Sequence, residues 1–96
     1  MKRIAVLALL RESKPEVVAR FGVKRLALFG STARDAAVAQ SDVDVLVEFD
    51  GPATSAQFFG AQFFLEDLLG CAVDLVTHKA LRPDLRPHVE RDSVDV

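Results

Sequence analysis

The chain has 96 residues, 50% of them hydrophobic, a length that fits one compact domain and leaves no room for a second hydrophobic core. The single cysteine excludes an internal disulfide, which makes a reducing cytoplasm the expected compartment, and no apolar run approaches the roughly 20 residues of a membrane span. The net charge is −2, and the window from Asp35 to His78 holds eight acidic residues and no Lys or Arg, which is not the profile of a protein that grips nucleic-acid phosphates. We expect a single domain over residues 1–96.

The N-terminal part predicts two helices in succession. Apolar residues recur at helical spacing from Ile4 to Leu10. The sequence SKPE then matches a capping box, with Ser13 as the N-cap and Glu16 three residues later. This pattern predicts that a second helix begins there, runs to about Phe21 with Val17, Val18 and Phe21 facing inward, and ends at Gly22.

The middle of the chain predicts a strand, a helix and a second strand. VKRLALF (residues 23–29) is short, apolar and bounded by glycines, which is typical of a strand. TARDAAVA (residues 32–39) is rich in alanine and predicts a helix. SDVDVLVEF (residues 41–49) alternates, so its valines fall on one face of a strand while Asp42 and Asp44 fall on the other.

The last third predicts a helix, a strand and an irregular tail. After the loop DGPAT, a helix is expected from near Ser55 to Gly70. AVDLVT (residues 72–77) is a short strand, and in the tail Pro83 and Pro87 restrict any helix to a short, kinked or restarted one. The element order predicts an α/β domain of the α+β kind, in which a small mixed sheet carries its helices mainly on one face.

A phosphate-binding turn is suggested by Gly30 and Ser31. They lie where the first expected strand passes into a helix, and the free N–H groups of a helix start attract anions. A Gly-Ser pair is also an ordinary N-cap, so the dipeptide alone leaves both readings open.

Two aspartates give a stronger signal. Asp42 and Asp44 are two residues apart on a strand, so their carboxylates leave the same face at neighbouring positions. Two like charges held together favour a cation between them, and ligands that are all oxygen favour a hard ion such as Mg²⁺ or Mn²⁺. The other reading is a polar face of an edge strand.

Asp74 lies in an apolar strand where we expect it to be buried or half-buried, and an unpaired buried carboxylate is costly. A metal shared with Asp42 and Asp44 would satisfy it if the two strands are neighbours. The alternative is a salt bridge to Arg25 or Arg34. Two metals about 3.5 to 4 Å apart support in-line displacement at phosphorus, and Arg34 could neutralise phosphate charge.

Three motifs in this order, GSTAR, SDVDVLVEF and VDLVT, resemble the signature of the DNA polymerase beta superfamily of nucleotidyltransferases. In particular the chain resembles the minimal nucleotidyltransferase (MNT) proteins that act as antitoxins beside HEPN toxins. The likeness covers nearly the whole chain, from RFGVKRLALFGS to LRPDLRP. It implies a polymerase-beta-like core as the fold.

The resemblance also implies an activity and its residues. Gly30, Ser31 and Arg34 would bind the nucleotide, as nucleotide-binding residues for ATP. The catalytic and metal-binding residues would be the three carboxylates, with both Mg²⁺ ions on Asp42 and Asp44, and with Asp74 holding the catalytic ion and helping to activate the acceptor hydroxyl. The acceptor would be a tyrosine of a HEPN-type toxin, silenced by adenylylation.

Two features depart from the family pattern. Asp35 stands where the family often has glycine after the arginine of the first motif, and an acidic group there would weaken nucleotide binding slightly. Pro87 interrupts what is commonly a continuous last helix. Because all three carboxylates are present, we expect an active enzyme.

Two other functions share these motifs. One is a binding module that neutralises its partner by occlusion, and the other is transfer to a small molecule such as an aminoglycoside, which needs an additional acceptor-binding domain or an oligomer. The segment FFGAQFFLEDLL holds four of the seven phenylalanines. Because two Phe pairs cannot all point inward, we expect one or two to be exposed, where they could dock a partner protein or a second copy in a homo- or hetero-oligomer.

Overall fold

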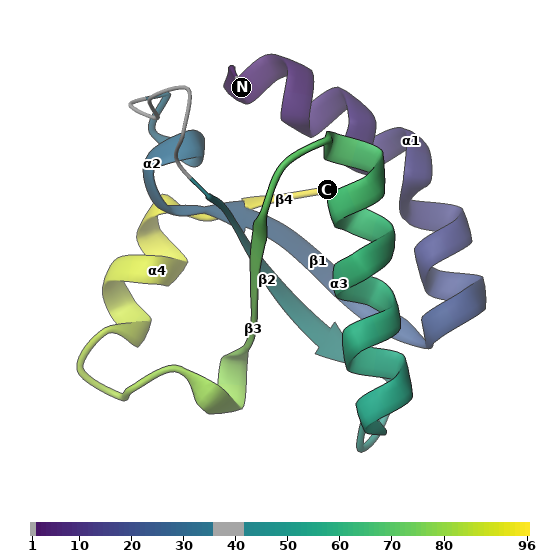
Figure 1. The fold of residues 1–96 in the computed structure, drawn as a ribbon. Coiled ribbons are helices and arrows are strands. Elements are labelled where there is room, and N and C mark those ends of the chain that lie inside the picture. Colours follow the sequence, from purple (N-terminus) through teal and green to yellow (C-terminus); the bar gives the residue numbers. More distant parts are fainter. Residues whose placement is uncertain (1, 36–41) are drawn as a thin grey trace.

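The computed structural model describes residues 2–35 and 42–96 as a mixed sheet flanked by helices (Figure 1). The elements in chain order are α1 (Arg3–Phe21), β1 (Val23–Phe29), α2 (Gly30–Ala33), β2 (Val43–Phe49), α3 (Ser55–Leu69), β3 (Val73–Thr77), the 3-10 turn η1 (His78–Ala80), α4 (Arg86–Asp92) and β4 (Val94–Asp95). No helix within these residues combines the length and apolar character that a membrane span requires.

The sheet has the strand order β3-β2-β1-β4. β1 pairs antiparallel with β2 and with β4, while β2 and β3 run parallel. The crossover between the two parallel strands is α3, the usual connection for such a pair. The prediction of a small mixed sheet is therefore confirmed.

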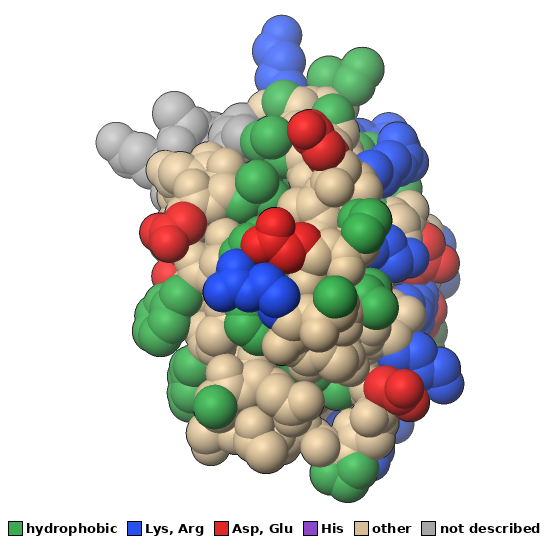
Figure 2. Space-filling view, turned by 90° about the vertical axis from the view of Figure 1, so that its right-hand side faces the viewer, with side chains coloured by type: hydrophobic (Ala, Val, Ile, Leu, Met, Phe, Trp, Pro, Cys, Tyr) green, Lys and Arg blue, Asp and Glu red, His purple; other side chains and the backbone are tan. Residues whose placement is uncertain are grey.

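Helices α1 and α3 cover one face of the sheet, and α4 lies on the other side (Figure 1). The main core forms between the sheet and the first two helices, and it includes Val6, Leu10, Val17, Leu26, Leu28, Val45, Val47 and Leu65. The opposite face buries a smaller apolar centre at Ala27 and Leu46, which pair across β1 and β2. Seen from the side of α1, the outer surface mixes acidic, basic and hydrophobic side chains (Figure 2).

Arg25 fastens the C-terminal segment to the sheet. Its guanidinium lies 3.3 Å from Glu90 of α4 and 3.0 Å from Asp95 of β4. The hydrogen bond that Arg25 donates to Glu90 is the largest effect that raises the pKa of Arg25, although partial burial opposes it. This network holds α4 in place beside the sheet, and α4 carries Asp92.

The prediction of two N-terminal helices is wrong, because residues 3–21 form the single helix α1 with Pro15 inside it. The Ser13 hydroxyl donates back to the Leu10 carbonyl at 3.2 Å instead of capping a new helix. Burial on both sides of the proline, at Leu10 and Val17, keeps the helix continuous despite the lost hydrogen bond. Val18, which we expected to face inward, is 40% exposed.

The alanine-rich helix over residues 32–39 is also corrected. Helix α2 ends at Ala33, Arg34 is its C-cap, and Asp35 adopts the left-handed conformation with φ of 56°. That conformation interrupts a helix, and it is the one in which glycine carries no penalty and aspartate a small one. The rest of the segment, residues 36–41, lies outside the described residues.

Helix α3 agrees with its prediction from Ser55 to Gly70, which terminates it with φ of 70°. Thr54 and Gln57 form a capping box at its start. Gly60 serves packing, since a Cβ there would lie 2.8 Å from Phe21 of α1. In the tail α4 restarts near Pro87, as expected, while β4 was not predicted because two residues carry no strand pattern.

Candidate functional site

The parallel register of β2 and β3 brings two of the three predicted carboxylates together. Asp44 pairs directly with Asp74, near the start of each strand. Both side chains leave the sheet on the face that α1 and α3 do not cover, because the valines and leucines before and after them pack into the core. Asp44 and Asp74, 30 positions apart in sequence, thus lie at one corner of the molecule, which we call the acidic corner.

The electrostatics of this corner are those of an uncompensated acidic cluster. Partial burial is the largest cause that raises the pKa of Asp44, followed by the negative charges of Asp74 and Asp42 and a hydrogen bond with Asp74. The positive charge of Arg34 acts in the opposite direction. Three other predicted residues, Asp42, Asp74 and Arg34, therefore lie within electrostatic reach of Asp44.

Asp74 differs from its prediction in two respects. It is exposed, although the apolar sequence around it indicated burial. The reason is the position of β3 at the edge of the sheet, where the face opposite α3 is open at this end. The alternative of a salt bridge to Arg25 or Arg34 is wrong, since within the described residues Arg25 pairs with Glu48, Glu90 and Asp95, and Arg34 pairs with Asp92.

Gly30 lies directly against the acidic pair. It follows β1, whose last residue Phe29 pairs with Asp44, and it has φ of 74°. A Cβ on Gly30 would overlap the Asp44 Oδ2 atom, so no other residue fits without moving the carboxylate. The turn expected to meet a phosphate and the carboxylates expected to meet a cation are therefore neighbours in space.

Ser31 and Arg34 complete the turn. Ser31 is half-buried in the first turn of α2. The Arg34 side chain is 54% exposed, and its Nη1 atom lies 3.2 Å from the Asp92 carboxylate of α4. Arg34 is thus shared between the acidic corner and the C-terminal segment.

The donor chemistry of the corner fits a hard divalent cation. Its ligands would be carboxylate oxygens, which Mg²⁺ and Mn²⁺ prefer. In the part of the chain that the structure describes, no three carboxylate, imidazole or thiolate groups converge into a ready metal cluster. A cation between the carboxylates would reduce their mutual repulsion. Gly30 packs closely against Asp44 without a side chain of its own, so the Asp44 carboxylate is the group that a ligand would meet. Metal binding by these residues stays a prediction.

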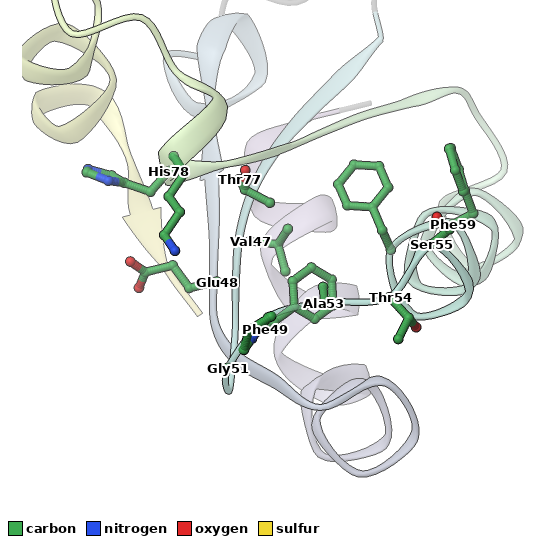
Figure 3. A pocket seen from close by; sticks show the side chains of 13 residues that line it. Val47, Glu48, Phe49, Gly51, Ala53, Thr54, Ser55, Phe59, Thr77 and His78 are labelled. Carbon is green, nitrogen blue, oxygen red and sulfur yellow. The ribbon is translucent and has the colours of Figure 1, made fainter.

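A second concave feature lies at the far end of the same two strands and was not predicted. This hollow, which we call the α3 pocket, has a volume of about 720 Å³ and is lined by residues such as Val47, Phe49, Ala53, Phe58 and Thr77. In Figure 3 Val47, Phe49 and Thr77 lie on the side of β2 and β3 that faces the start of α3, whereas Glu48 and His78 point to the other side of the strands. Asp44 is five residues from Phe49 along β2, which is about 16 Å. The α3 pocket is therefore separate from the acidic corner.

The exposure of part of the Phe-rich segment is confirmed. Phe59 and Phe63 are 51% and 60% exposed, while Phe58 and Phe64 pack against the core. The rings of the exposed pair stack, with centroids 6.5 Å apart. The α3 pocket itself could not be read from the sequence, although the paired phenylalanines after a Gly-Pro loop were the available signal.

Comparison with known proteins connects this arrangement to a known group. The model of the family described as "Nucleotidyltransferase domain" matches residues 10–96. The protein adenylyltransferase MntA of Thermococcus cleftensis is 38% identical over 89 residues, which cover 93% of this chain and 90% of that protein.

Solved structures show the same fold. A structure assigned as a minimal nucleotidyltransferase has a TM-score of 0.84 and 36% identity, covering 100% of this chain and 97% of the other. A toxin–antitoxin structure with AMP-PNP has a TM-score of 0.68 at 21% identity, covering 99% of this chain and 72% of the other. A tri-AMPylated HEPN toxin of Shewanella oneidensis in complex with an MNT antitoxin gives 0.58 at 20%, covering 97% and 66%. At such identities the last two show a common fold.

Proposed function

The chain belongs to the nucleotidyltransferase domain family, and on this premise we propose that it transfers AMP from ATP to a hydroxyl group of a HEPN-type toxin, acting as its antitoxin in the cytoplasm. The observation that carries the proposal is the register of β2 and β3, which sets Asp44 beside Asp74 with Gly30 against the pair.

The carboxylates have distinct roles in this proposal. Asp42 and Asp44 would hold two Mg²⁺ ions, with Mn²⁺ as the alternative, and Asp74 would hold the catalytic ion. When bound, the ions stabilise the attacking and the leaving oxygen at phosphorus. Asp74 lies in the exposed position that an acceptor from another molecule can reach, and it draws the proton from the acceptor hydroxyl.

Gly30 and Ser31 hold the triphosphate, and Arg34 neutralises its charge. In the reaction a bond forms between the acceptor oxygen and the α-phosphorus of ATP. The bond from that phosphorus to the oxygen that bridges to the β-phosphate breaks, and pyrophosphate leaves with its electron pair. The product is an AMP ester of the acceptor, which we take to be a tyrosine.

Two findings support a protein as the acceptor. The relative from Thermococcus cleftensis is named a protein adenylyltransferase and matches over nine-tenths of both chains. The S. oneidensis structure of the same fold contains an AMPylated HEPN toxin. A chain of this size must also receive its acceptor at a surface, since it has one compact core.

The test is label transfer from ATP carrying the label on its α-phosphate, with Mg²⁺ and the purified HEPN-type partner. The α position separates nucleotidyl transfer from kinase chemistry, which moves the γ-phosphate. We expect label on the partner with the native chain and none with Asp44→Asn. Label that persists undiminished with Asp44→Asn would contradict the assignment of the site.

One other function is favoured by a specific observation. The exposed Phe59 and Phe63 offer an apolar contact surface, so the chain could neutralise its partner by occlusion alone. The two functions separate in an assay of toxin activity. Occlusion predicts that inhibition persists without ATP and in the Asp42→Asn/Asp44→Asn double variant, whereas AMP transfer predicts that it is lost under both conditions.

A further inference from the structure

The outer flank of α3 presents an apolar stripe formed by Phe59 and Phe63. These residues are one helical turn apart, both are exposed, and their rings stack. Because Phe59 also lines the α3 pocket, the stripe adjoins the apolar part of the pocket, whose lining also includes the charged Glu48 and Lys79. An exposed aromatic pair that leads into a hollow is typical of a contact site for another protein.

This flank of α3 faces the open edge of the sheet. Gln62 and Glu66, which follow the stripe around the helix, bond to the edge strand β3: the Gln62 amide donates to the Val73 carbonyl at 3.1 Å, and the Val73 N–H donates to Glu66 at 3.0 Å. Phe59 and Phe63 therefore lie on the β3 side of α3, away from α1.

The outward backbone groups of the edge strand β3 are hydrogen-bonded to α3 at the start of the strand and are open to a partner toward its end. The bonds of Val73 to α3 side chains occupy its outward backbone groups. Alternate residues of a strand in a parallel ladder direct their backbone groups away from the neighbouring strand, and after Val73 these residues are Leu75 and Thr77. Within residues 2–35 and 42–96, no strand pairs with β3 on that outward side. The open part of the edge adjoins the α3 pocket, which Thr77 lines.

We propose that this surface, made of the Phe59–Phe63 stripe, the α3 pocket and the open end of β3, is where the protein acceptor docks. A bulky apolar side chain of the acceptor enters the α3 pocket, whose volume lies in the usual range for sites that enclose a ligand group. The proposal rests on the proposed function, since it names the surface that holds the protein whose hydroxyl is modified.

The distance between the two sites sets a length on the acceptor. Thr77 is three residues from Asp74 along β3, about 10 Å, and the deeper Phe49 is about 16 Å from Asp44 along β2. Asp44 and Asp74 leave the sheet on the face that α3 does not cover, whereas the α3 pocket lies on the α3 side. The acceptor must therefore pass around the β3 edge, and its apolar anchor must lie more than roughly 10 to 16 Å from the hydroxyl that receives AMP. An isolated tyrosine cannot reach both sites, and even a fully extended peptide needs more than about three to five residues between its anchor and its tyrosine.

The exposed area favours an acceptor over a second copy of the chain. Phe59 and Phe63 are 51% and 60% exposed, which corresponds to roughly 100 Å² of exposed surface for each side chain. This area is far below the roughly 800 Å² that each partner buries in a stable dimer. A two-fold contact through the stripe would also leave the α3 pocket of each copy unfilled. A transient contact with a substrate protein needs neither a large area nor symmetry.

The experiment measures the affinity of the purified HEPN-type partner for the chain by calorimetry, and separately the KM for this partner and the KM for ATP in the transfer assay. The variant is Phe63→Asp, which changes an exposed side chain. The matched control is Ile4→Asp, which places the same charge on an apolar residue that is 78% exposed on α1. A second variant, Ala53→Trp, fills the α3 pocket from its exposed rim.

We expect Phe63→Asp and Ala53→Trp each to weaken partner binding and raise the KM for the partner about tenfold, with the KM for ATP unchanged and Ile4→Asp without effect. Partner binding that is unaltered by both variants, or lost equally with Ile4→Asp, overturns the proposal, as does a partner that does not bind the native chain.

The binding measurement also keeps this proposal separate from the proposed function. If the partner binds, and binds more weakly to Phe63→Asp, but receives no AMP from the native chain, the docking surface stands and the transfer reaction fails. If the partner receives AMP with the same KM from native chain and from both variants, the reaction stands and the docking surface fails.

Discussion

The two ends of the β2–β3 pair are built from opposite kinds of side chain. At the end where both strands start, Asp44 and Asp74 repel each other across one register position, and partial burial raises the pKa of Asp44 further. At the other end, Val47 and Phe49 face the hollow under α3. Charge repulsion at the acidic end favours the binding of a cation, whereas exposed apolar surface at the other end favours contact with an apolar side chain.

The substitution with the largest expected effect is Asp44→Asn, which removes one negative charge from the acidic end of the β2–β3 pair. We expect transfer to fall about a thousandfold or more, because a bound metal supplies several kcal/mol of transition-state stabilisation and each 1.36 kcal/mol is tenfold. We also expect stability to rise by about 1 kcal/mol or less, since the substitution removes repulsion in a partly exposed group. Rates and thermal unfolding of both chains measure the two effects, and a variant that is inactive because it unfolds would count against this reading.

Metal removal tests the same end without mutation. With EDTA in excess we expect transfer to stop while the circular dichroism of the fold is unchanged, and we expect Mg²⁺ or Mn²⁺ to restore it. Mg²⁺ should raise the Tm of the native chain, because a cation between Asp44 and Asp74 relieves their repulsion. The Tm of Asp44→Asn should respond less. Equal shifts in the two proteins would place the cation elsewhere.

Gly30→Ala sharpens the contrast by moving a carboxylate without removing it. The new Cβ would overlap Asp44 Oδ2, so we expect transfer to fall at least about tenfold and stability to fall by about 1 to 3 kcal/mol. Gly70→Ala is the matched control, because its φ of 70° imposes the same strain and nothing lies within 4 Å of its Cβ. Equal losses of transfer in the two variants would show that strain, and not the contact with Asp44, is responsible.

The smallest effect concerns Arg34, which pairs with Asp92 in this structure. Nucleotide phosphates must compete with Asp92 for Arg34, and an exposed ion pair is worth about 0.2 to 1 kcal/mol. We therefore expect Asp92→Asn to lower the KM for ATP by about 1.5- to 5-fold with little change in kcat. Asp84→Asn, which breaks the exposed Arg82–Asp84 pair, serves as the control. A raised KM would mean that Asp92 positions Arg34 for the nucleotide.

The residues of the acidic corner could be predicted because their motifs are local. Alternation in residues 41–49 predicts a strand that carries Asp42 and Asp44 on one face, and the apolar run around Asp74 predicts the next strand. In the structure β2 begins at Val43, so Asp44 lies on the strand and Asp42 directly precedes it. The exposure of Asp74 could not be predicted, since it depends on the place of β3 at the sheet edge. The same limit applies to Arg34, whose partner Asp92 is 58 residues away.

The extent of helix α1 also could not be predicted from local sequence alone. Ser13 and Glu16 satisfy the pattern of a helix start, yet the burial of Leu10 and Val17 against the sheet keeps one helix running through Pro15. Local patterns state what a segment can form, and tertiary packing decides between the options.

By itself the sequence determined the fold class, the three carboxylates and the glycine turn, because each depends on residues close together along the chain. Only the tertiary structure decided that Asp44 and Asp74 share a register position, that Gly30 touches Asp44, and that a hollow lies under α3. These features depend on contacts between segments far apart in sequence. Such contacts follow from how the whole chain packs, and no local pattern specifies them.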